Sequence, residues 1–249
     1  MLSGTAEVFG TELAIQQVYK FQGTKSAIFT WHGCSIEVIG KCQVEYVAEE
    51  TPLVSHANLH FALERLRDAA VSSGQAGPRV LIVGPDNAGK TSLAKLLTAY
   101  ATRSGRPVVT VNLNPREGLL TIPGTFSAAS FTTILDVEAG WGSSPTNAAT
   151  HVPVKLPLVY FLGAETLEED TTISKPTMSR LALSMLGRVQ DDVRVRPAGC
   201  IIDSPGSISQ GQPNYDLMQH VISEFQGKAK PLLYRQPLLT EHQSLSLSF

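Results

Sequence analysis

Eight consecutive residues of this chain have the types and the spacing needed to hold a nucleoside triphosphate. They run Gly84-Pro85-Asp86-Asn87-Ala88-Gly89-Lys90-Thr91 and complete the pattern G-x-x-x-x-G-K-[ST]. In such a loop the backbone N–H groups surround the phosphates, the lysine reaches the β- and γ-phosphates, and the hydroxyl holds Mg²⁺. We therefore predict a phosphate-binding loop in which Lys90 contacts the phosphates and Thr91 is a metal ligand.

A phosphate loop also needs a carboxylate for the metal and, in a kinase, a base for the incoming hydroxyl. The run Gly199-Cys200-Ile201-Ile202-Asp203 is an apolar strand that ends in an acid. This pattern favours Asp203 as the second metal ligand and as a candidate catalytic residue; a solvated aspartate in a turn is the alternative. The other apolar strand ends in Leu113-Asn114, and an amide cannot accept a proton from a hydroxyl. The catalytic residue therefore stays unassigned.

Other chemical patterns are weaker. Asp203-Ser204-Pro205-Gly206 fits the DxxG turn of GTPases, but the guanine-reading sequence NKxD is absent from the chain, which disfavours a GTPase-like switch. The six histidines show no metal-type grouping. We expect the helix near His56 and His60 to begin at Asn58, which would separate that pair. Trp141, between two glycines, is a better candidate than Trp31 for stacking on a base, and we expect Trp31 in the core.

The surrounding elements predict an α/β fold. Short apolar runs at 79–84, 107–113, 157–162 and 199–203 indicate strands, and helical spacing predicts helices at 90–103, 177–190 and 214–226. Alternation of strands and helices is typical of a P-loop NTPase-type parallel sheet with crossover helices. The stretch 115–155 shows no strong period, and so long a loop in a compact domain is usually functional or mobile.

Four segments make up the chain. Residues 1–50 contain short β-rich runs, including 18–21, 26–31 and 35–39, and predict a small all-β module. Residues 51–78 form a connecting helix and linker, residues 79–226 the P-loop domain, and residues 227–249 an irregular tail. Pro231 and Pro237 should interrupt any sheet strand within that tail.

Composition excludes several classes of protein. Of the 249 residues, 43% are hydrophobic and 17% charged, which argues against wholesale disorder. A net charge of −2 gives no overall electrostatic footprint for nucleic acid. The three cysteines are far apart and predict neither a disulfide framework nor a zinc site. The N-terminus lacks a signal-peptide pattern and no run approaches about 20 apolar residues, so we expect no membrane association.

Several segments, in order from about residue 4 to 226, resemble one family. It is the fungal type of the polynucleotide 5′-hydroxyl kinase-like ATP-binding subunit of the mRNA cleavage and polyadenylation machinery (cleavage factor IA). The matching segments are Ala6 to Leu13, Phe29 to Cys34, Tyr46 to Pro52, Asn58 to Glu64, Gly84 to Ser92, Thr121 to Thr125 and Gly199 to Asp203. The resemblance implies an ATP site formed by Gly84, Asn87, Ala88, Gly89, Lys90, Thr91 and Ser92, with Lys25 reaching the nucleotide from the β module.

Three departures from the family pattern shape the functional expectation. Asn114 stands where active kinases of the family carry an aspartate. The chain begins inside the β module, so the glutamate that the family places beside adenine has no counterpart. Residues 227–249 match nothing in the family, so the chain looks shortened.

The resulting expectation is a nuclear subunit that binds ATP and Mg²⁺ and has little or no kinase activity. ATP would then act as a structural ligand between the β module and the P-loop domain. The expected partners are other subunits of the cleavage and polyadenylation factor, with RNA as a candidate. The alternative is an active ATP-dependent polynucleotide 5′-hydroxyl kinase.

Overall fold

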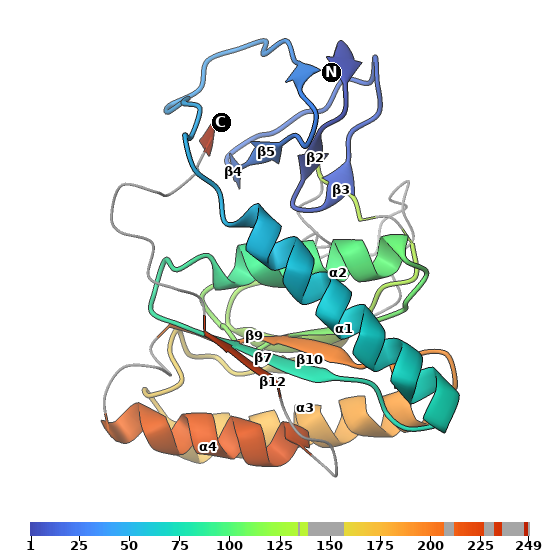
Figure 1. Ribbon diagram of the computed structural model, residues 1–249. Coiled ribbons are helices and arrows are strands. Elements are labelled where there is room, and N and C mark those ends of the chain that lie inside the picture. The colour runs from blue at the N-terminus through green and yellow to red at the C-terminus, as the bar shows by residue number, and fades with distance from the viewer. Residues whose placement is uncertain (134, 139–156, 207–211, 227–231, 236–246, 249) are drawn as a thin grey trace.

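The computed structural model describes residues 1–133, 135–138, 157–206, 212–226, 232–235 and 247–248. A six-stranded sheet lies at the centre, with helices α1 and α2 on one face and α3 and α4 on the other (Figure 1). The N-terminal β module lies beyond α1 and α2, on the side away from the sheet. A small β module followed by a P-loop domain was predicted from the sequence, and this fold class is confirmed.

The central sheet has the strand order β10-β9-β8-β11-β7-β12. Strands β8, β11, β7 and β12 are parallel, whereas β9 runs antiparallel to both of its neighbours. The sheet is therefore mixed. Their bounds are β7 (Arg79–Val83), β8 (Val109–Asn112), β9 (Thr125–Ser130), β10 (Leu158–Phe161), β11 (Cys200–Asp203) and β12 (Leu232–Arg235).

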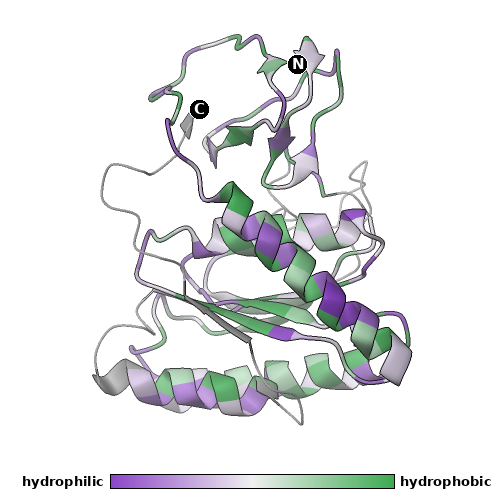
Figure 2. Ribbon diagram, in the orientation of Figure 1, coloured by the Kyte–Doolittle hydropathy of each residue, from purple (hydrophilic) through white to green (hydrophobic). Residues whose placement is uncertain are grey.

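Apolar side chains on both faces of the sheet hold the helices in place. Val80 and Ile82 of β7 pack with Leu63 of α1 and Leu97 of α2, while Leu81 joins the cluster formed by α3 and α4. Successive strand residues point to opposite faces, so an uninterrupted apolar strand supplies both cores. In Figure 2 the described strands of the sheet are mostly hydrophobic, whereas the helices carry both hydrophobic and hydrophilic residues.

The helices are α1 (Leu53–Ser73), α2 (Lys90–Arg103), α3 (Thr171–Asp191) and α4 (Gln212–Gln226), with a 3-10 turn at Arg196–Ala198. The bounds predicted for α2 are confirmed. The expected start of α1 at Asn58 was wrong, because the helix begins after Pro52 without a side-chain cap. Helix α3 starts earlier than predicted, where the Asp170 side chain accepts a hydrogen bond from the backbone of Thr172.

The N-terminal module consists of three small sheets. Its strands are two residues long: β1 (Ser3–Gly4), β2 (Glu7–Val8), β3 (Thr11–Glu12), β4 (Lys25–Ser26), β5 (Ile28–Phe29) and β6 (Cys34–Ser35). Residues 18–21 form no strand, and 35–39 contribute only their first residue to one. Trp31 was expected in the core, but it is 46% exposed and lies edge-on against Phe29.

Part of the expected irregular tail is a strand. Residues 232–235 form β12, which pairs in parallel with β7, and β13 (Leu247–Ser248) pairs with β4 of the N-terminal module. The prediction that Pro231 and Pro237 would interrupt any sheet strand here was wrong, because the four-residue strand β12 fits between the two prolines.

Candidate nucleotide-binding site

The phosphate loop lies between the end of β7 and the start of α2, as the sequence predicted. Asn87 and Gly89 adopt left-handed backbone conformations with φ of 59° and 76°. These conformations turn the chain sharply, and Gly89 occupies the position that immediately precedes α2. The N-terminus of α2 and its unpaired N–H groups therefore face the space enclosed by the loop.

Lys90 lies against the loop and is only 6% exposed. Its ammonium donates a 2.7 Å hydrogen bond to the carbonyl oxygen of Pro85. Burial lowers the pKa of Lys90, while the nearby carboxylates of Asp203 and Asp86 raise it. A buried ammonium held next to the N-terminus of a helix is suited to bind the phosphate groups of a nucleotide.

Thr91 and Asp203 meet across the site. The Thr91 hydroxyl donates a 2.6 Å hydrogen bond to Asp203 Oδ2, and Asp203 is fully buried at the end of β11. Burial raises the pKa of Asp203 to about 7, although the Thr91 hydrogen bond opposes this shift. Within the described residues, Asp203 Oδ1 has no hydrogen-bond partner. The Thr91 hydroxyl and the Asp203 carboxylate, one of whose oxygens is unsatisfied, are the kind of hard oxygen donors that suit Mg²⁺.

Asn114 lies at the same edge of the sheet. In the parallel register Asn112 is opposite Asp203, and Asn114 follows two residues beyond the end of β8. It is 9% exposed, and its side-chain oxygen accepts a 3.3 Å hydrogen bond from the backbone N–H of Arg116. The structure therefore brings Lys90, Thr91, Asp203 and Asn114 to one end of the sheet.

Gly206 forms a contact that the sequence did not predict. A Cβ atom added to Gly206 would lie 1.9 Å from Asp86 Oδ1 and 2.4 Å from the Asp86 backbone nitrogen. The turn that follows Asp203 is therefore pressed directly against the phosphate loop. The DxxG pattern from Asp203 to Gly206 was the only sequence signal for this contact, and it was too short to rely on.

The remaining candidates do not gather at this site. Lys25 lies in β4 with an exposed side chain, and within the described residues no hydrogen bond or ion pair joins it to the loop. Trp141 lies outside the described residues. His56 and His60 are both buried on α1, where burial lowers their pKa values, and the described chain has no group of three His, Cys, Asp or Glu residues able to hold a metal ion.

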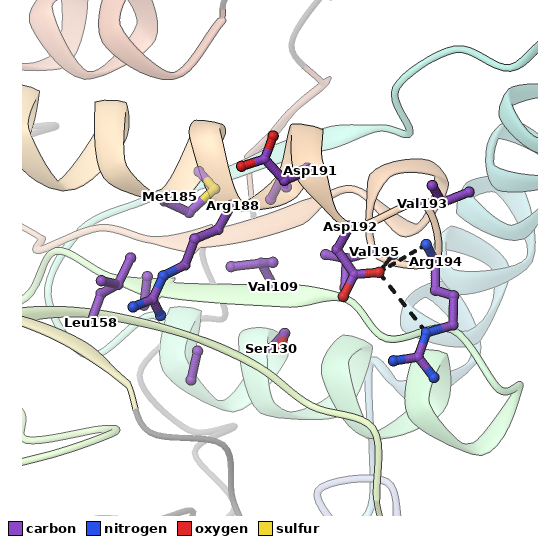
Figure 3. Close-up of a pocket in the computed structure, with 13 residues that line it drawn as sticks. Val109, Ser130, Leu158, Met185, Arg188, Asp191, Asp192, Val193, Arg194 and Val195 are labelled. Carbon is purple, nitrogen blue, oxygen red and sulfur yellow. Dashed lines mark hydrogen bonds and ion pairs between the residues drawn. The ribbon is translucent and has the colours of Figure 1, made fainter.

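A cavity of about 530 Å³ lies elsewhere in the molecule. It is lined by the amino-terminal ends of β8 and β10, the carboxyl-terminal end of β9 and the end of α3, including Val109, Ser130, Leu158 and Arg188 (Figure 3). The phosphate loop follows the carboxyl end of β7, and β8 runs in the same direction as β7. The cavity and the phosphate loop therefore lie at opposite ends of the parallel strands. The cavity is not part of the candidate nucleotide site, which is formed by the phosphate loop and the residues around it.

Two family models match the chain. Residues 1–70 match the N-terminal β-sandwich domain of polyadenylation factor, and residues 84–246 match the P-loop of the mRNA cleavage and polyadenylation factor CLP1.

Individual relatives and structures agree with these matches. The chain is 59% identical over 225 residues to the mRNA cleavage and polyadenylation factor clp1 of Botryotinia fuckeliana, covering 90% of this chain and 49% of the relative. It is 55% identical over 226 residues to CLP1 of Phaeosphaeria nodorum, covering 90% and 48%. The chain thus spans about half the length of the curated relatives it matches.

Two solved structures have the same fold. The first is a structure of Clp1p with Pcf11p that is described as giving the structural basis for ATP loss in a glycine-to-arginine point mutant. It has a TM-score of 0.80 at 33% identity, and the match covers 94% of this chain and 55% of that one. The wild-type Clp1p–Pcf11p complex has a TM-score of 0.78 at 32% identity, covering 94% and 54%. The chain belongs to the Clp1 family of mRNA cleavage and polyadenylation factors.

Proposed function

We propose that this chain is an ATP-binding subunit of the nuclear machinery that cleaves and polyadenylates pre-mRNA, with little or no kinase activity. The observation that carries the proposal is the complete phosphate loop, in which Lys90 and Thr91 face the buried Asp203. When bound, Mg²⁺ would supply positive charge next to the phosphates, and Thr91 and Asp203 are the residues that would hold it. ATP is favoured over GTP because the sequence has no guanine-reading NKxD motif.

The β module supports a structural role for the nucleotide. It contacts the phosphate-loop helix directly, because the buried Glu7 accepts a 2.5 Å hydrogen bond from the hydroxyl of Tyr100 on α2. A ligand that orders the start of α2 therefore stabilises the element on which the module is docked. We retain Lys25 as the residue that would contact the nucleotide from the module.

Partners follow from the family. The structural neighbours are complexes of Clp1p with Pcf11p, so we propose that this chain binds a corresponding subunit of the cleavage factor in the nucleus. RNA is a second candidate partner. Within the described residues no helix has the length and apolar character that crossing a bilayer requires.

An active polynucleotide 5′-hydroxyl kinase is the second candidate, and one observation favours it. Asp203 is a fully buried carboxylate with one oxygen that has no partner within the described residues, and that oxygen could accept a proton from a hydroxyl if Thr91 held Mg²⁺ without it. Against it stands Asn114, whose amide cannot take that role.

Calorimetric titration with ATP and with GTP tests the binding proposal. Lys90→Ala should weaken ATP binding by about 2–4 kcal/mol, because it removes a charge-assisted contact from the phosphates. Equal ATP affinity in the wild type and the variant would reject the site. A phosphate-transfer assay on 5′-hydroxyl RNA separates the two candidates, since robust transfer by the wild type supports the kinase.

A further inference from the structure

Lys95 is a charged residue of the phosphate-loop helix, and no carboxylate of the described part of the chain forms an ion pair with it. It lies four residues after Thr91 on α2, so the two side chains share one face of the helix. Its side chain is half-buried, and within the described residues it forms no hydrogen bond or ion pair with a carboxylate. Its ammonium instead lies over the ring of Phe9, 5.3 Å from the ring centroid.

Phe9 holds this position at a cost in backbone energy. It occupies the two-residue turn between β2 and β3, with φ of 45°, and is followed by Gly10 with φ of 85°. Turns with two positive φ angles favour asparagine, aspartate and glycine, and a bulky residue there is strained. A strained residue that persists at such a place is reason to look for a function.

The turn is pressed against α2, which fixes the ring on the lysine. A Cβ atom added to Gly10 would lie 2.9 Å from the Cβ of Ala99 and 3.1 Å from the backbone oxygen of Leu96. The same hairpin is anchored by the buried Glu7, which bonds to Tyr100. The N-terminal module therefore delivers an aromatic face to a lysine of the phosphate-loop helix.

The charges around Lys95 are those of the nucleotide site. Burial lowers the pKa of Lys95, while the carboxylates of Glu117 and Asp203 raise it without pairing with it. The same two carboxylates act on Lys90, which is also influenced by Asp86 of the loop. The two lysines thus share one electrostatic environment, with Lys95 displaced along α2 away from the loop.

We propose that Lys95 is a second phosphate-binding residue of this site, supported by the ring of Phe9, and that it binds a phosphate group beside those cradled by the loop. The proposal rests on the proposed nucleotide-binding function. A half-buried ammonium without a counter-ion is stabilised when an anion arrives. The phosphate has two possible sources: the γ-phosphate of the bound nucleotide, or the 5′-terminal phosphate of a second ligand.

Lys95→Met and Lys95→Arg test the proposal, with Arg180→Met as the matched control. Arg180 is an exposed cation on α3, across the sheet, so its loss changes net charge equally. ATP and ADP are titrated with Mg²⁺ by calorimetry. A 5′-phosphorylated and a 5′-hydroxyl oligoribonucleotide are then titrated in saturating Mg²⁺ and ADP.

If the γ-phosphate is the ligand, Lys95→Met should lose about tenfold or more in ATP affinity and retain its ADP affinity. If a second ligand supplies the phosphate, the same loss should appear for the 5′-phosphorylated strand alone. Lys95→Arg should remain within about threefold of the wild type in either case, because it keeps the charge. Phe9→Leu should produce part of the same loss without changing any charge.

Affinities of Lys95→Met that all stay within about twofold of the wild type would overturn the proposal. A second result would also overturn it: Lys95→Arg folds, whereas Lys95→Met and Lys95→Gln both fail to fold. The positive charge at this position would then be needed for folding. Lys90→Met distinguishes a failure of the underlying function. If that variant binds ATP as tightly as the wild type, the loop is not a nucleotide site at all.

Discussion

The Thr91 hydroxyl donates a 2.6 Å hydrogen bond to Asp203 and so joins the phosphate-loop helix to the end of β11. The two residues are far apart in the sequence, and the parallel pairing of β11 with β7 is what brings them together. The bond leaves the second oxygen of a fully buried carboxylate without a described partner. A carboxyl group in this environment should control how the stability of the ligand-free protein depends on pH.

Replacing Asp203 with asparagine should remove part of that pH dependence. The folded-state pKa of about 7 lies above the unfolded value of about 3.9, so between these pH values the folded protein holds a proton that the unfolded chain has released. The free energy of unfolding therefore falls as pH rises from about 4 to about 7, by up to about 4 kcal/mol. Urea unfolding at several pH values, without Mg²⁺ or nucleotide, should show that the free energy of unfolding depends less steeply on pH for Asp203→Asn than for the wild type. Identical slopes would contradict the prediction.

Gly206→Ala should displace the phosphate loop. The added methyl group would lie 2.4 Å from the backbone nitrogen of Asp86, as well as 1.9 Å from its Oδ1, so either the turn or the loop must move. Overpacking of this kind costs about 1–3 kcal/mol, and here part of it should appear as weaker ATP binding in calorimetry. Gly187→Ala is the control, because nothing lies within 4 Å of its added Cβ. An ATP affinity of Gly206→Ala equal to that of the control would show that the contact has no bearing on the site.

Glu7→Ala should loosen the N-terminal module from α2. Glu7 is 5% exposed, and its carboxylate accepts hydrogen bonds from the hydroxyl of Tyr100 at 2.5 Å and the guanidinium of Arg103 at 3.3 Å. Removing it leaves a buried donor unsatisfied, which costs about 1–3 kcal/mol. Glu12→Ala is matched to it, because Glu12 contacts the same arginine but is 57% exposed and should contribute little. Equal losses in urea unfolding would show that burial of Glu7 is unimportant.

The sequence predicted the elements whose signals are local. The P-loop pattern placed the loop and α2 correctly, and the apolar run before Asp203 placed β11. Strand β9 was missed because Thr125-Phe126-Ser127-Ala128-Ala129-Ser130 contains a single large apolar residue. It is a strand because it lies between β8 and β10, and that pairing is not visible from its own residues.

Contacts between distant segments were the other part that could not be predicted. Neither the turn at Phe9 nor Lys95 has a distinctive local pattern, and their contact exists only because the N-terminal module docks on α2. The contact between Gly206 and Asp86 likewise joins two loops. Asn114 could be placed near the site, because neighbouring parallel strands end at the same edge of a sheet.

Asn114→Asp should raise phosphate transfer to 5′-hydroxyl RNA from a very low or absent level in the wild type. A positioned base contributes roughly 10²–10⁴-fold to proton transfer, and an asparagine side chain cannot act as one. Aspartate has nearly the same shape, and its oxygen can keep the hydrogen bond from the backbone of Arg116, so the variant should fold. Transfer of γ-labelled phosphate is measured for the wild type, Asn114→Asp and the double variant Asn114→Asp with Lys90→Ala. The double variant should lose any gain, because it removes a phosphate contact. Robust transfer by the wild type would contradict the proposal that the chain has little or no kinase activity and would favour an active kinase.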